Sequence, residues 1–238
     1  MADRPGGGGV AAVDRAFAIV AAVAEEIEPI SLARIAAATG FYKSTVLRLL
    51  ASIEAAGYVS RLADGRYAIG PAAQRLGTAY ERSNPFRNYV QPVLKALVDE
   101  GSESASFHVR CGPDRRLCLF RVDSRHPTLD RINPGDVLPL DRGAAGRVLA
   151  AFDEPGDARL AQVRVTCFAQ SLGEREVGCS GLAAPVFTAD TRLAGALSLS
   201  GPTERFTPDM IATWRPRLIT AAVGLSGVLG GDYPATAG

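Results

Sequence analysis

Two short helical segments separated by a glycine constrain the fold of this 238-residue chain more than any other feature. The first segment is expected over residues 32–38, with Ser31 as a suitable N-cap, and the second over residues 43–56. Gly40 lies between them and can adopt the left-handed backbone that a tight turn requires. This spacing is typical of a DNA-binding helix-turn-helix, although a helical hairpin within another helical domain would share it.

The helix pair has suitable residues at its expected contact. Ala36 is small enough to let the two helices approach, and Val46 and Leu49 can pack the second helix against the first. An earlier helix is expected over residues 13–27, because apolar residues recur there at helical spacing. Its predicted apolar stripe consists of Val13, Phe17, Val20, Val23, Ala24 and Ile27.

Polar side chains gather at the start of the second helix, off its apolar stripe. Lys43, Ser44, Thr45 and Arg48 occupy this end. The N-terminal residues of a recognition helix contact base edges and phosphates in the major groove. We therefore predict that these four residues face DNA.

A hairpin is expected directly after the helix pair. The dipeptide Asp64-Gly65 separates two β-like runs, which is a strong hairpin signal. Such a hairpin would form a wing, with Arg61 and Arg66 near its tip. Residues 31–75 hold six basic and two acidic residues, a balance of +4, whereas the whole chain has a net charge of +1. This local basic patch favours DNA binding by this part of the chain alone.

The pattern changes at Asn84-Pro85 to a mixture of strands and helices. Strands are expected over 105–111, 116–122, 181–187 and 193–199, and helices over 89–100, 144–152 and 210–228. This pattern predicts an α+β domain. The expected organisation is a flexible tail over 1–12, a winged helix-turn-helix over 13–70, a linker helix over 71–84, a second domain over 85–231 and a tail over 232–238.

Composition and cysteine usage exclude several protein classes. Hydrophobic residues make up 47% of the chain and charged residues 21%, as in globular proteins. None of the four cysteines forms a Cys-x-x-Cys pair, and the N-terminus has no apolar core of a secretory signal. No apolar stretch is long enough to cross a bilayer. We therefore expect a cytoplasmic protein without a membrane partner.

Several blocks of the sequence resemble one known family. The blocks at residues 31–40, 43–50, 57–59 and 67–70 look like the winged helix-turn-helix of the IclR-type transcriptional regulators. Those at residues 139–140, 145–150, 173–178, 182–186 and 197–202 are similar to the effector-binding domain of that family. The resemblance covers residues 13 to 228. It implies a GAF-like second domain that binds a small organic acid and thereby changes how the protein binds double-stranded operator DNA. Since one recognition helix contacts little DNA, a homodimer or tetramer is expected.

The resemblance also assigns residues to the effector pocket. By family position these are Ala144, Ala145, Ser171, Gly181, Ser198 and Ser200. Small residues before a helix leave backbone N–H groups open to a carboxylate, although a turn that needs them only for packing would have the same composition. Alternation with two leucines places Ser198 and Ser200 on one face of a strand, which faces either the pocket or water.

Two departures from the glyoxylate-responsive members of the family concern this pocket. They have an Asp where this chain has Ser171, and a Cys where it has Gly181. An acid that is larger or less polar than glyoxylate would therefore fit better. The segment 152–162 is also shorter than the helical insert usual in the family, which would shorten one wall of the pocket or expose the ligand.

Other functions are less well supported by the residues. Residues 178–181 lack one position of a nucleophile elbow, and His108, Cys111 and Cys118 do not have standard zinc spacing. Residues 143–146 lack the glycine pattern and the lysine of nucleotide-binding loops. We therefore predict no catalytic residues, metal or cofactor, and a DNA-binding regulator controlled by an organic acid. The alternative is a GAF-like sensor that acts mainly through protein contacts.

Overall fold

The computed structural model describes residues 9–83, 86–126, 130, 132–153 and 156–234. The chain divides into two compact units, Met1–Asn84 and Pro85–Gly238. Most of the expected tails, residues 1–8 and 235–238, lie outside the described residues. Within the described ranges, no helix is both long enough and apolar enough to cross a membrane.

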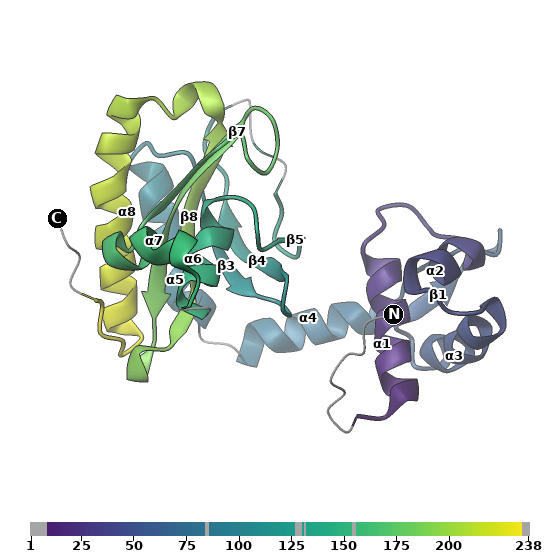
Figure 1. The fold of residues 1–238 in the computed structure, drawn as a ribbon. Helices are drawn as coiled ribbons and strands as arrows, with labels where there is room; N and C mark the ends of the chain where they lie inside the picture. The colour runs from purple at the N-terminus through teal and green to yellow at the C-terminus, as the bar shows by residue number, and fades with distance from the viewer. Residues whose placement is uncertain (1–8, 84–85, 127–129, 131, 154–155, 235–238) are drawn as a thin grey trace. The chain divides into compact units, whose positions relative to one another are not determined.

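The first unit is a winged helix-turn-helix, as predicted (Figure 1). Its helices are α1 (Ala11–Ala24), α2 (Leu32–Thr39), α3 (Lys43–Ala55) and α4 (Pro71–Ser83), and the wing consists of β1 (Val59–Arg61) and β2 (Tyr67–Ile69). The hydroxyl of Ser31 caps α2 by accepting a hydrogen bond from the Arg34 amide. Gly40 ends this helix at a φ of 71°, which an L side chain would strain. The tight turn thus follows from the glycine.

Helix α1 differs from the prediction in its end and in its buried face. It ends at Ala24 and not at Ile27, and its buried residues are Ile19, Ala22 and Val23. Phe17, which was predicted on the inner stripe, is 69% exposed. The helix has two apolar sides, and contact with α2 and α3 decides which of them enters the core. The apolar pattern in the sequence does not indicate which of the two sides is buried.

The second unit is built on one antiparallel sheet in the order β5-β4-β3-β8-β7-β6, and the predicted α+β class is confirmed (Figure 1). The strands are β3 (Ser104–Arg110), β4 (Arg115–Val122), β5 (Val137–Pro139), β6 (Ala169–Leu172), β7 (Cys179–Phe187) and β8 (Leu193–Pro202). The two edge strands, β5 and β6, were not predicted. They are three and four residues long, too short for a clear alternating pattern.

The helices cover both faces of this sheet. The main core joins α5 (Phe86–Asp99) and α8 (Pro208–Val228) to one face, where Phe107, Leu197 and Leu199 are buried. Helix α6 (Ala144–Asp153) packs on the other face, against residues such as Ala183 and Ala196. Because neighbouring residues of a strand point to opposite faces, Ser198 and Ser200 lie on the α6 side.

The short segment after α6 forms only brief helical turns. A 3-10 turn, η1, spans Ala158–Leu160, and α7 spans Ala161–Thr166. Of the segment 152–162, residues 154–155 lie outside the described part of the chain. Helix α7 was not predicted, because its six residues make fewer than two helical turns and so show no clear apolar periodicity.

Candidate functional site

The outer side of α3 presents most of the predicted DNA-contacting side chains to solvent. Lys43, Ser44 and Arg48 are exposed and Thr45 is half-buried. On the opposite side of the helix, residues such as Val46 are completely buried in the core of the unit. The helix therefore separates a polar face from a packed face at its N-terminal end, which is the end that enters the groove in helix-turn-helix proteins.

The two wing arginines are exposed but differ in their partners. The guanidinium of Arg61 lies 5.9 Å from the centre of the Tyr67 ring. Arg66 donates from Nε to Asp64 over 2.7 Å and from Nη1 to the carbonyl oxygen of Pro29 over 3.4 Å. The backbone N–H of Arg66, followed by its side chain, lowers the pKa of Asp64. Arg61 is thus the wing cation without a carboxylate partner among the described residues.

Sequence reasoning missed one prominent side chain beside α3. Tyr42 directly precedes the helix and is 86% exposed. It lies at the N-terminal end of α3, the end that carries Lys43 and Ser44, and that position in the sequence was the available signal.

The structure brings all six predicted effector-pocket residues to one small cavity on the α6 side of the sheet. Ala144, Ala145, Ser171, Gly181, Ser198 and Ser200 all line it. The register of the strands pairs Ser171 with Gly181 and Gly181 with Ser200, which sets three of them in one row. The cavity measures about 30 Å³, room for about one water molecule in this conformation.

The N-terminal turn of α6 forms one wall of this cavity. The first helical hydrogen bond runs from the Arg147 amide to the carbonyl oxygen of Gly143 over 3.1 Å, so the earlier amides have no acceptor within the helix. A Cβ on Gly146 would lie 2.2 Å from the carbonyl oxygen of Leu140. Gly146 is therefore required for close packing, and the same turn leaves N–H groups open to an anion.

The two serines of β8 face the cavity and not water, which decides between the alternatives left open by the sequence. Both Ser198 and Ser200 are buried. The hydroxyl oxygen of Ser200 accepts a hydrogen bond from Nη1 of Arg121 over 3.3 Å. Ser198 has no side-chain partner among the described residues.

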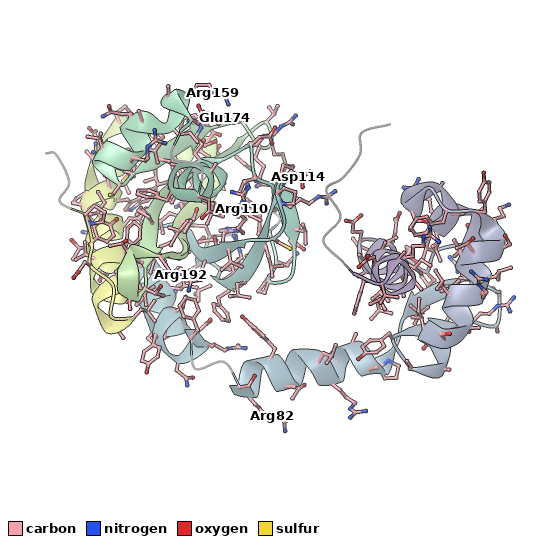
Figure 2. All side chains as sticks on the ribbon, turned by 60° about the horizontal axis from the view of Figure 1, so that its bottom comes forward. Arg82, Arg110, Asp114, Arg159, Glu174 and Arg192 are labelled. Atoms are coloured by element: carbon pink, nitrogen blue, oxygen red, sulfur yellow. The ribbon has the colours of Figure 1, made fainter. Side chains whose placement is uncertain are left out.

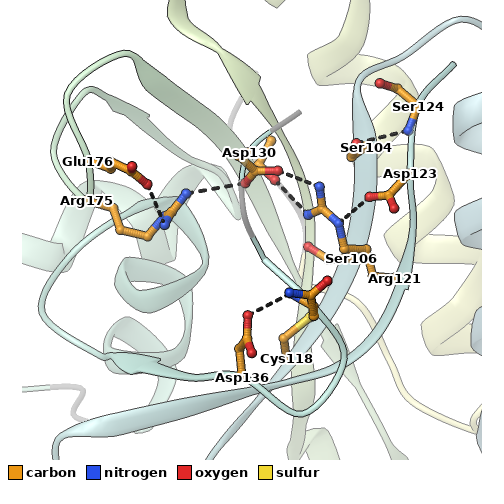
Figure 3. A network of polar contacts seen from close by, with 12 residues as sticks. Ser104, Ser106, Cys118, Arg121, Asp123, Ser124, Asp130, Asp136, Arg175 and Glu176 are labelled. Carbon is orange, nitrogen blue, oxygen red and sulfur yellow. Dashed lines mark hydrogen bonds and ion pairs between the residues drawn. The ribbon is translucent and has the colours of Figure 1, made fainter. Parts of the chain in front are cut away.

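Two arginines line this cavity, the buried Arg116 and the half-buried Arg175, and sequence reasoning did not identify them. A third, the buried Arg121, contacts Ser200 on the cavity wall. Figure 3 shows the ion pairs of Arg121 and Arg175. Arg121 donates to Asp123 over 2.6 Å and also pairs with Asp130. Arg175 lies 3.4 Å from Asp130 and 3.4 Å from Glu176. The alternation of charged and apolar residues in β4 was a possible signal, but an arginine in an alternating strand normally faces water.

His108 is also buried on the cavity wall. Its Nε2 lies 3.0 Å from the hydroxyl oxygen of Ser106, and its Nδ1 has no hydrogen-bond partner. Burial, followed by the charge of Arg116, lowers the pKa of His108 well below its usual value. The imidazole is therefore neutral at physiological pH and can offer either a donor or an acceptor to a ligand.

The residues weighed for metal binding or catalysis include Cys111, Cys118 and Ser180. Cys118 is buried, which raises the pKa of its thiol to about 12, and Cys111 is exposed. The hydroxyl of Ser180 is hydrogen-bonded to that of Thr203 over 2.9 Å. In the part of the chain that the structure describes, no group of three His, Cys, Asp or Glu residues could hold a metal ion.

A larger groove of about 1010 Å³ lies beyond α6, where the short segment 157–163 forms one side. It is lined by the turn before β4, which includes Asp114, by Arg147 and Ala150 of α6, by the β6 edge, and by Arg159 of η1 (Asp114 and Arg159 are labelled in Figure 2). Arg147 pairs with Glu174 over 2.6 Å, and Arg159 pairs with Asp157 over 2.8 Å. The charges around the groove are therefore largely balanced locally.

Comparison with protein families gives matches in both units. Residues 12–63 match the IclR helix-turn-helix domain, and residues 157–227 match the C-terminal domain of bacterial transcriptional regulators of the IclR type. The chain is 25% identical over 258 residues to the transcriptional repressor IclR of Escherichia coli, covering 97% of this chain and 94% of that protein. It is 26% identical over 245 residues to the regulator BhcR of Paracoccus denitrificans, covering 92% and 87% respectively.

Solved structures show the same fold over nearly the whole chain. An IclR-type regulator from Silicibacter sp. TM1040 has a TM-score of 0.79 and 27% identity, covering 94% of this chain and 98% of that one. An IclR homolog from Microbacterium hydrocarbonoxydans, complexed with 4-hydroxybenzoate, has a TM-score of 0.71 at 18% identity, covering 92% and 99%. The second likeness concerns the fold alone.

Proposed function

The chain belongs to the IclR family of transcriptional regulators, and from this premise we propose that it binds its operator as a homodimer or tetramer and releases or tightens its hold when a small organic acid occupies the cavity beside α6. It is a DNA-binding regulator with a C-terminal effector-binding domain, as its relatives are. We assign it a regulatory and not a catalytic role.

The outer face of α3 supports the DNA-binding half of this proposal. Lys43, Ser44 and Arg48 project from the helix that follows the Gly40 turn, while its other side is packed. Long cationic and hydroxyl side chains in this position can contact phosphates and base edges together. Arg61 of the wing adds a further phosphate contact, and Arg66 contributes less, because Asp64 already neutralises it.

Two exposed apolar surfaces of the first unit support self-association. Phe17 and Val13 on α1 are both exposed, and so are Leu76 and Tyr80 on α4. A single recognition helix buries too little surface for operator-grade affinity, whereas a symmetric pair contacts two half-sites. We propose that these helices form the dimer contact.

The cavity beside α6 supports an organic acid as the effector. Open amides at the start of α6 suit a carboxylate, and Ser198 can orient a second polar group. Ser171 and Gly181 supply neither the carboxylate nor the thiol of glyoxylate-responsive members. An aromatic acid, the class bound by the Microbacterium homolog, is the favoured candidate, provided that the cavity of about 30 Å³ widens on binding.

The direct test is binding of the purified full chain to DNA from upstream of its own gene. We expect an affinity that falls steeply with salt, and a change of affinity on adding 4-hydroxybenzoate or another aromatic acid. The alternative, a sensor that acts through protein contacts, predicts no preference for this DNA over a scrambled duplex at any salt concentration. That result would refute the proposed function.

A further inference from the structure

Arg116 of β4 is a buried cation without a carboxylate partner among the described residues. It is only 2% exposed and lines the small cavity. Its Nη1 donates to the carbonyl oxygen of Arg142 over 2.7 Å and to that of Pro139, and its Nε is buried without any hydrogen-bond partner. Carbonyl oxygens satisfy hydrogen bonds but do not balance a full positive charge. An isolated buried charge is costly, so this site favours an anion.

The neighbouring arginines differ from Arg116 in this respect. Arg121 is paired with Asp123 and Asp130, and Arg175 with Asp130 and Glu176 (Figure 3). Their charges are balanced within the protein. Among the described residues that line the cavity, Arg116 is therefore the arginine whose charge is not compensated. Burial lowers the pKa of Arg116 to about 10, which is the direction expected for a cation that lacks a counter-ion.

Two glycines place this guanidinium against the N-terminal turn of α6. A Cβ on Gly143 would lie 3.4 Å from Nη2 of Arg116, and one on Gly146 would lie 2.8 Å from Nη1. Larger residues would push the guanidinium away from the turn. Because of this placement, the positive end of the helix and the full charge of Arg116 act on the same side of the cavity.

A second unpartnered group borders the same cavity. Nδ1 of His108 is buried without a hydrogen-bond partner, and the imidazole is neutral. A ligand that meets both groups would be an anion at Arg116 and would have an uncharged polar atom at His108. A carboxylate that also carries a hydroxyl group, such as a hydroxylated aromatic acid, has this chemistry, whereas a cation or an uncharged amide does not.

We propose that Arg116 is the counter-ion of the effector carboxylate and makes the cavity selective for carboxylates over their uncharged isosteres. This inference rests on the proposed function, because it assumes that the cavity is where the effector binds. The inference adds Arg116 as the residue that selects the class of ligand. Arg116 is not among the pocket residues assigned by family position.

The test uses formate, a carboxylate small enough for the cavity, and formamide as its uncharged isostere. Formate should raise the melting temperature of the full chain saturably, relative to sodium chloride of equal ionic strength, and formamide should not. Calorimetric titration should show at least tenfold weaker formate binding by Arg116→Met. Arg116→Lys keeps the charge and should retain a measurable part of that binding.

Arg142→Met is the matched control. It also removes one positive charge beside α6, but its side chain is exposed and only its carbonyl oxygen touches the site. We expect wild-type formate binding from it. Equal formate affinity for wild type and Arg116→Met, or no saturable binding by wild type, would overturn the assignment. If Arg116→Met does not fold, Arg116→Lys serves as the test. Formate binding by Arg116→Lys that is no stronger than formamide binding would then overturn the assignment.

Operator binding, measured on the same preparations, distinguishes a failure of the Arg116 assignment from a failure of the proposed function. If wild type binds its operator and an acid acts equally on wild type and Arg116→Met, the assignment of Arg116 fails and the proposed function stands. If wild type does not bind operator DNA, the proposed function fails, whatever formate does.

Discussion

Arg121 on β4 donates a hydrogen bond to the hydroxyl oxygen of Ser200 on β8, over 3.3 Å and across 79 residues of sequence. The same guanidinium pairs with Asp130, which also pairs with Arg175. The orientation of Ser200 on the cavity wall therefore depends on a buried ion network, so the serine cannot be treated as an independent hydrogen-bonding group.

Removing Asp130 should destabilise the second unit strongly. Asp130→Ala removes the buried carboxylate that the buried Arg121 shares with the half-buried Arg175. We expect a loss of about 3–5 kcal/mol in the free energy of unfolding, measured by denaturant titration. Asp123→Ala is the matched control, because Asp123 binds the same arginine from an exposed position, and its loss should be about 1 kcal/mol or less. Similar losses for both variants would contradict a central role for Asp130.

Arg48 should contribute directly to operator affinity. Its exposed side chain lies on the polar face of α3, so Arg48→Ala should fold normally and weaken operator binding by about 1–3 kcal/mol if the arginine contacts a guanine edge. Titration of labelled operator DNA measures this loss. Arg192→Ala removes an exposed arginine from the second unit and should have no comparable effect. Wild-type affinity in the folded Arg48→Ala variant would disprove the assignment.

Phe17 should be part of the dimer contact. Because Phe17 is exposed, Phe17→Glu should leave the fold intact, shift the protein towards a monomer and weaken operator binding. Light scattering at micromolar concentration gives the mass. Ile27→Glu alters another exposed apolar residue of the same unit and should remain a dimer or tetramer. A monomeric mass for wild type would refute the proposed association itself.

Ala145→Glu should abolish the response to effector while operator binding persists. The new carboxylate would fill the cavity and repel the carboxylate of the ligand. The measurement is calorimetric titration of both proteins with aromatic and short aliphatic acids. Val177→Glu adds the same charge at a position that is almost fully exposed and should respond as wild type does. Equal ligand affinity for wild type and Ala145→Glu would place the effector site elsewhere.

His108 should make stability depend on pH. In the unfolded chain it binds a proton near its ordinary pKa of 6.5, whereas in the folded chain its pKa is well below that value. The stabilisation from the neutral imidazole is therefore fully present above pH 6.5. As the pH falls below this value, the free energy of unfolding decreases by about 1.4 kcal/mol per pH unit. Denaturant titrations between pH 7 and pH 5 should show a shallower fall for His108→Gln than for wild type. Parallel curves would mean that the buried imidazole becomes protonated in the folded state.

The DNA-binding unit was predictable because its signals are local. Ser31 caps α2 through its own side chain, and Gly40 ends it through its own backbone freedom. The position of a side chain on α3 then follows from helical periodicity, so the exposed and buried faces were read correctly. For α1 the same reasoning was right for Val23 and wrong for Phe17, because either of its two apolar sides could have packed inward.

The effector site was predictable only in part. Alternation in β8 fixed Ser198 and Ser200 on one face, but only the packing of α6 on that face made it the wall of a cavity. The short edge strands β5 and β6 left no periodic signal.

The sequence by itself determined the helix-turn-helix, the wing and the α+β class, since caps, turns and periodicity act within a few residues. Only the tertiary structure decided that Arg116 and His108 border the same cavity as Ala145 and Ser200. Whether a charged side chain is buried with or without a counter-ion depends on segments that are distant in sequence. No local pattern contains that information, because it is the folding of the sheet around α6 that brings these groups together.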